Sequence, residues 1–131
     1  MPSRWGALAL GLLAIGVFTS AAEAAEGPVA ALSKTLATEE SRSGFASPHL
    51  LPLLDRLAGA QFDDGELADA ADSRRRVLKI VVRAYGGNST NAADAMVALA
   101  NVELLRHRYS RAEPLLIAAL PALEARFGAD S

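Results

Sequence analysis

The chain has 131 residues, a formal net charge of −2 and no cysteine. This length allows one small domain, and a charge near zero gives no long-range attraction toward nucleic acid or anionic lipid. The lack of cysteine excludes disulfides, thiolate metal sites and a thiol nucleophile. Hydrophobic residues make up 51% of the chain, and the frequent alanine and leucine among them favour helices.

Residues 1–24 have the three parts of a secretory signal. Arg4 is the positive flank, and an uninterrupted apolar run extends from Ala7 to Phe18. Small side chains at Ala22 and Ala24 predict cleavage after Ala24, with cleavage after Ala22 or retention as an anchor left open. The run is shorter than the roughly 20 residues of a bilayer span. We therefore expect a bacterial exported protein, periplasmic or secreted, with no stable membrane anchor after cleavage.

Residues 25–46 are predicted to be a linker or a partial helix around Pro28 to Ala37. From Ser47 onward the chain aligns with itself at an offset of 42 residues, which divides it into units 47–88 and 89–131. The matches that carry this alignment are Leu57-Ala58 with Leu99-Ala100, Ala70 with Ala112, Leu78 with Leu120 and Gly86 with Gly128. Each unit has the apolar spacing of two helices.

The first unit begins with a capping residue, Ser47, followed by Pro48, which suits the first turn of a helix. An apolar stripe then predicts a helix from Pro48 to Phe62. A second helix should extend from Glu66 to about Arg83, and Gly86 should follow its end because glycine reaches positive φ at little cost. The small residues Ala58, Ala70, Ala100 and Ala112 are expected where paired helices cross closely.

The second unit repeats this plan. Ser89 or Thr90 should cap a helix that ends near Arg106. Ser110 and Glu113 form a plausible capping box for a last helix that ends at Phe127 and Gly128. Pro121 lies inside that helix and should bend it near Ile117, because proline removes one backbone hydrogen bond.

These spacings resemble the tetratricopeptide repeat, and more narrowly the 42-residue form found in kinesin light chains. The stronger match is LANVELLRHRYSRAEPLLIAALPALEARFG, in which Tyr109, Ala112, Glu113, Pro114, Leu115 and Leu116 fall where that family has them. Departures occur at four positions: Gln61 and Glu103 replace the usual Tyr, His107 the usual Gly and Arg74 an apolar residue. The resemblance covers residues 47–131. It implies an all-α fold, in which two antiparallel helix pairs form a short right-handed α-solenoid.

By this resemblance, the first helix of each pair lines a concave groove that holds a peptide or protein segment. Carried onto this chain, the groove positions are Asp55, Arg56, Gly59, Phe62 and Asp63 in the first unit and Asp94, Val97, Ala98, Asn101, Leu104 and Leu105 in the second. Asn101 could donate to and accept from a peptide backbone, and Arg56 could bind a carboxylate. Alternatively, these are ordinary solvated or half-packed helix positions.

Other motifs favour simpler interpretations. Arg74-Arg75-Arg76 spans roughly 200° of a helix, which favours a solvated face over a nucleic-acid surface and leaves a salt-bridge site for a partner open. The only two histidines, His49 and His107, stand at opposite ends of their helices, so we expect no metal site. Neither GxSxG nor SxxK occurs, and Gly86-Gly87 is not followed by the lysine of a phosphate loop. We predict neither an enzyme nor a cofactor.

Two functions remain in competition. The first is an exported, non-catalytic interaction module that binds a protein or peptide partner in its groove. The alternative is a self-associating structural subunit, either a homodimer or part of a cell-envelope complex. The apolar last helix, Leu115 to Phe127, favours this alternative.

Overall fold

The computed structural model describes residues 27–128, and the predicted leader lies outside these residues. A first helix covers residues 27–43 and ends before Gly44. It is followed by a 3-10 turn, η1 (Pro48–Leu50), and by four helices: α2 (Leu51–Asp63), α3 (Leu67–Tyr85), α4 (Thr90–Leu105) and α5 (Tyr109–Phe127). Every regular element between residues 27 and 128 is helical, which confirms the all-α prediction.

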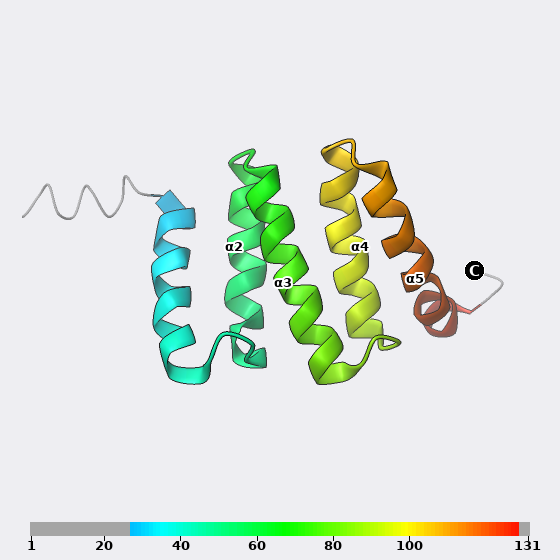
Figure 1. Cartoon of the computed structure of the whole chain (residues 1–131), viewed down its shortest axis with the longest axis horizontal. Helices are drawn as coiled ribbons and strands as arrows, with labels where there is room; N and C mark the ends of the chain where they lie inside the picture. Colours follow the sequence, from blue (N-terminus) through cyan, green and yellow to red (C-terminus); the bar gives the residue numbers. More distant parts are fainter. Residues whose placement is uncertain (1–26, 129–131) are drawn as a thin grey trace, which may run out of the picture.

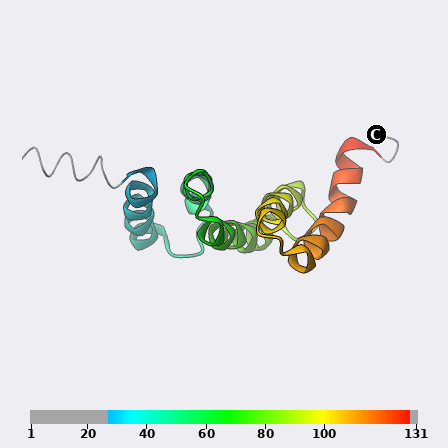
Figure 2. The same cartoon turned by 90° about the horizontal axis from the view of Figure 1, so that it is seen from above.

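The helices stand side by side in chain order (Figure 1). Helix α2 packs against α3, α3 against α4 and α4 against α5, and successive helices run in opposite directions. Seen from above, α2 and α4 lie on one side of the array, and α3 and the start of α5 lie on the other (Figure 2). This is the predicted stack of two antiparallel helix pairs. None of the helices described is long and apolar enough to cross a bilayer.

The first helix is longer than the sequence predicted. Leu36 is buried in the cluster that contains Leu54 and Ile80, and Val29 and Leu32 pack against that cluster. Much of the remaining helix surface consists of serine and threonine, whose hydroxyls donate to carbonyls one turn earlier in the same helix. Such residues are weak helix signals, because their side chains compete with the backbone ladder.

Three glycines mark the same point in successive units. Gly44, Gly86 and Gly128 follow one another at intervals of 42 residues and have φ of 94°, 95° and 83°. In register, the first helix therefore corresponds to α3 and α5, the second helices of their pairs. The described part of the chain contains two complete helix pairs preceded by half of another.

Two of the three predicted serine caps are confirmed. Ser47 Oγ accepts from the backbone N–H of His49, and Ser89 Oγ accepts from that of Ala92. The capping box at Ser110 is wrong, because α5 already begins at Tyr109 and its first turn has no side-chain cap. The turn between α4 and α5 therefore lies before Ser110. It contains His107, which has a φ of 59° and takes the place that Gly65 has in the first unit.

The core consists of two adjoining clusters. The larger one joins Leu50, Leu54 and Leu57 to Val77, Ile80 and Val81 of α3 and to Ala92 and Ala95 of α4. The smaller one joins Ala70 and Ala71 to Leu99 and Val102. Ala58, Ala70, Ala100 and Ala112 are all buried, as expected of residues at close helix crossings.

Helix α5 bends along its length, as Figures 1 and 2 show. It contains Pro114 and Pro121, and the absent N–H of Pro121 leaves the carbonyl of Ile117 without its usual helical donor. The bend confirms the prediction made from Pro121. Near the end of the bent segment, Arg126 Nη1 lies 3.2 Å from Asp94 Oδ1, which links α5 to the start of α4.

Candidate functional site

Two adjoining hollows lie between α2 and α4 and have α3 as their floor. The larger has a volume of about 570 Å³ and the smaller about 310 Å³. Arg74 and Ala98 line both hollows, so the two hollows adjoin at these residues, and we call the pair of hollows the groove. The larger hollow is lined by Leu51, Asp55, Arg74, Val77, Val81, Tyr85, Asn91, Asp94, Ala95 and Ala98. The smaller is lined by Ala58, Gly59, Phe62, Asp63, Arg74, Ala98, Asn101 and Val102.

Val77 and Val81 give the larger hollow an apolar floor, whereas the charged Arg74 lies at the floor of both hollows, and both rims carry polar side chains. Arg74 Nη1 donates to Asp55 Oδ1 at 2.9 Å, which links α3 to α2. Asp94 pairs with Arg126 at the opposite rim. Both aspartates are more than half exposed, and ion pairs of exposed carboxylates contribute only about 0–1 kcal/mol. A ligand that offers its own charges can therefore compete with them at small cost.

The groove brings together four of the six principal residues predicted for it. Asp55 and Asp94 line the larger hollow, and Phe62 and Asn101 line the smaller. Arg56 and Leu105 are exposed but line neither hollow. A role in binding stays a prediction for all six.

Sequence reasoning missed the contribution of α3, because it assigned the groove to the first helix of each pair. Arg74 lies at the junction of the two hollows, and Tyr85 lines one end of the larger. Asn91 of α4 was also missed. The sequence did contain a signal for a groove role of Arg74, since this charged residue stands where related repeats have an apolar one.

The arginine run is not a freely solvated face, contrary to prediction. Each arginine is partly buried and pairs with a different neighbour. The contacts are Arg74 with Asp55 at 2.9 Å, Arg75 with Asp72 at 2.7 Å and Glu103 at 3.7 Å, and Arg76 with Glu40 at 2.7 Å. The solvated prediction failed because the acidic partners of Arg74 and Arg76 lie 19 and 36 residues away in sequence. The run is a set of structural ion pairs.

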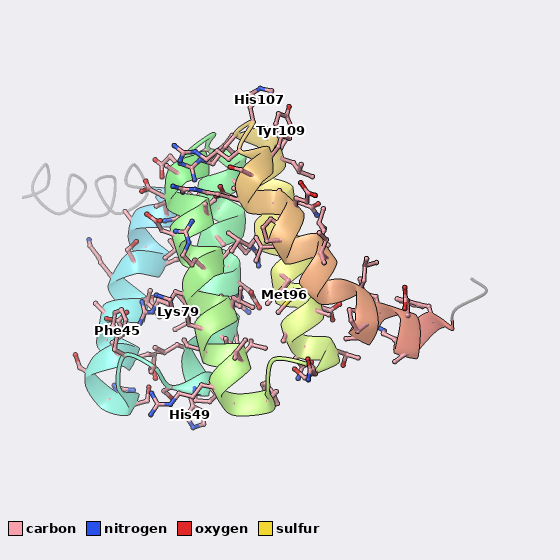
Figure 3. The ribbon with its side chains drawn as sticks, turned by 45° about the vertical axis from the view of Figure 1, so that its right-hand side comes forward. Phe45, His49, Lys79, Met96, His107 and Tyr109 are labelled. Carbon is pink, nitrogen blue, oxygen red and sulfur yellow. The ribbon has the colours of Figure 1, made fainter. Side chains whose placement is uncertain are left out.

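The structure brings together no metal-ligand set among residues 27–128. No three histidine, aspartate or glutamate side chains in this range lie close enough to hold a metal ion. His49 and His107 lie at opposite ends of the helices, as Figure 3 shows. His107 Nδ1 instead lies 3.0 Å from the hydroxyl of Tyr109, so it is engaged at the α4–α5 turn.

Comparison with known proteins agrees with this architecture. No curated protein matches the chain. A family model described as tetratricopeptide repeat matches residues 50–125, which is more than half of the chain and includes all of the groove. The match extends from the 3-10 turn before α2 almost to the end of α5. The chain belongs to the tetratricopeptide repeat family.

Proposed function

We propose that this protein is an exported, non-catalytic interaction module that binds a peptide or protein segment in the groove between α2 and α4. The observation that carries the proposal is that the two hollows adjoin and share Arg74 and Ala98 in their lining. Two adjoining hollows lined by both apolar and polar side chains suit an extended chain, which presents side chains and backbone amides together.

The dimensions of the groove favour a short extended segment. Asn91 and Asn101 lie on α4 and both line the groove. Ten helical residues span about 15 Å, which is the length of four or five residues of an extended chain at about 3.3 Å each. Each side-chain amide can both donate to and accept from such a backbone. The small side chains at Ala58, Gly59 and Ala98 leave room for close approach.

Export is the second part of the proposal, and the leader-like residues 1–24 support it. Mass spectrometry of the protein recovered from its producing cells tests this part directly. We expect a mature chain that begins at Ala25, or at Glu23 if cleavage follows Ala22. Recovery of only the intact 131-residue chain from the cytoplasm would refute export without affecting the groove.

Selection from a random peptide library tests the groove. We expect the 131-residue chain to enrich peptides that compete with one another for one site. Ala98→Gln places a longer side chain at the junction of the two hollows and should weaken the selected peptides at least tenfold. Ala118→Gln is the matched control, since Ala118 is exposed on α5 and lines neither hollow. Equal binding by both variants would refute the groove as the site.

A further inference from the structure

The outer face of α5 repeats the face of α3 on which α4 packs. In α3, Leu67, Ala71 and Leu78 belong to or pack against the cluster that contains Leu99 and Val102 of α4. A shift of one repeat, 42 residues, turns these three positions into Tyr109, Glu113 and Leu120. They line a hollow of about 350 Å³ together with Leu104, Leu116, Ile117 and Leu123. We call these seven residues the α5 face.

No residue in the described range 27–128 covers the α5 face as α4 covers α3. Tyr109, Ile117 and Leu120 are 59%, 58% and 50% exposed. The face is also more apolar than its counterpart, because Leu116 and Ile117 stand in register with Arg74 and Arg75 of α3. Figure 1 shows α5 as the last helix of the array, with its outer side open. A contiguous apolar patch of this kind is typical of an interaction surface.

Among residues 27–128, the other end of the stack does not offer a matching apolar surface. The first helix exposes Ser33, Thr35 and Ser41, whose hydroxyls bond to its own carbonyls. A polar outer face is what a terminal helix of a repeat stack needs in water. Head-to-tail stacking of two copies would therefore oppose an apolar face to a polar one.

Charge also disfavours pairing of two α5 faces. Glu113 is the only charged residue that lines the hollow. Glu124 is exposed and directly follows Leu123, the last residue of the α5 face, so its carboxylate lies at an edge of that face. Two copies packed through this face would bring four carboxylates to one seam. A helix with lysine or arginine beside its apolar stripe would instead complement this edge.

We propose that the α5 face is a second docking surface, which binds an amphipathic helix of a different protein. The partner helix presents apolar side chains at i, i+3, i+4 and i+7 and carries lysine or arginine beside that stripe, opposite Glu113 and Glu124. It occupies the position that the first helix of a further repeat would occupy, just as α4 occupies the equivalent position on α3. This surface, which includes Leu104 of α4, shares no lining residue with the two hollows between α2 and α4.

The test uses two synthetic amphipathic peptides of about 18 residues, or five helical turns. One has a leucine stripe flanked by lysines, and the other has the same stripe flanked by glutamates. Titration into the 131-residue chain, followed by calorimetry and by amide chemical shifts, should show that the lysine peptide binds at α5. The glutamate peptide should bind at least tenfold more weakly.

Two matched leucine variants separate docking from folding. Leu120→Glu should abolish binding of the lysine peptide, whereas Leu105→Glu should leave it unchanged. The two leucines are 50% and 52% exposed, and only Leu120 lies on the α5 face. Glu113→Lys should remove most of the preference between the two peptides, because it leaves Glu124 opposite a lysine and brings the local charge to zero. Peptides selected by the groove should bind Leu120→Glu normally, so the two proposals can fail separately.

Four results would overturn the inference. These are no binding of the lysine peptide, equal affinity for both peptides, chemical shifts confined to the groove, and binding that survives Leu120→Glu. Sedimentation analysis supplies one more outcome. A concentration-dependent dimer that Leu120→Glu disrupts would assign the face to a second copy of this chain and would also overturn it.

Discussion

Glu103 is a carboxylate enclosed between α3 and α4, and it is only 1% exposed. Its Oε1 atom lies 2.9 Å from Arg106 Nη1 and 3.7 Å from Arg75 Nη2. In register it corresponds to Gln61, which accepts from Ser73 at 2.7 Å within the first helix pair. Both units therefore keep a buried polar residue at this position. Glu103 connects α4 back to the preceding repeat, whereas Gln61 acts inside its own.

Removal of this carboxylate should destabilise the stack. Glu103→Ala is expected to lower the free energy of unfolding by about 2–4 kcal/mol, since it leaves a cavity and two partly buried arginines without their shared partner. Urea denaturation followed by circular dichroism measures the change. Asp72→Ala is the control, because Asp72 also pairs with Arg75 but is 72% exposed. It should cost no more than about 0.5 kcal/mol. Equal losses in the two variants would contradict the assignment.

Two glycines should respond in opposite ways to the same substitution, depending on the element that contains them. Gly86 ends α3 with φ 95° and ψ 155°, a region that residues with a Cβ rarely adopt. Gly86→Ala should therefore lower stability by about 1–3 kcal/mol. Gly59 lies inside α2, and a Cβ there would meet nothing within 4 Å. Gly59→Ala should raise stability by about 0.5–1 kcal/mol. Thermal or urea unfolding checks both, and a shift in the same direction would refute this explanation.

In addition to the apolar packing of Leu36, the first helix is attached to the stack through Arg76. This side chain pairs with Glu40 at 2.7 Å, donates to the carbonyl of Phe45 at 2.8 Å and stacks over the Phe45 ring at 3.6 Å. Arg76→Ala should therefore speed amide exchange in residues 27–43 about tenfold, as expected for local opening, and leave α4 unchanged. Arg42→Ala is the control, because within the described range Arg42 pairs only inside its own helix, with Glu39 at 3.5 Å. Unchanged exchange in Arg76→Ala would contradict this role.

The helix ends were predictable from sequence where the signal was local. Ser47, Ser89 and Gly86 act through backbone groups within a few residues, so their spacing was sufficient. The arginine partners were not predictable, because Asp55 and Glu40 approach Arg74 and Arg76 only after the helices have packed. The groove was likewise only partly predictable. The sequence placed Asn101 and Phe62 in it, but the contribution of α3 was missed because it depends on the distance between α2 and α4 in the packed structure.

On the scale of the whole molecule, the stack is close to one-dimensional. Its main contacts join helices that are adjacent in sequence, so stability should be approximately a sum of helix pairs and the interfaces between them. Helix α3 has packed neighbours on both sides, α2 and α4. Helix α5 packs against α4 and has its outer face open. The two ends therefore have fewer stabilising interfaces than the centre.

This asymmetry predicts a gradient of hydrogen exchange along the chain. Amides of α3 should exchange only through global unfolding, because opening α3 breaks both of its interfaces. Amides in the second half of α5, beyond Pro121, should exchange at least about tenfold faster through local opening. Exchange followed by mass spectrometry at peptide resolution measures this gradient, and adding the lysine-flanked peptide should slow exchange in α5 selectively. Uniform protection from α2 to α5 would show instead that the stack opens only as a whole. It would also show that the exposed face of α5 does not make this helix less stable than the others, so that a partner helix would have no local instability to reduce.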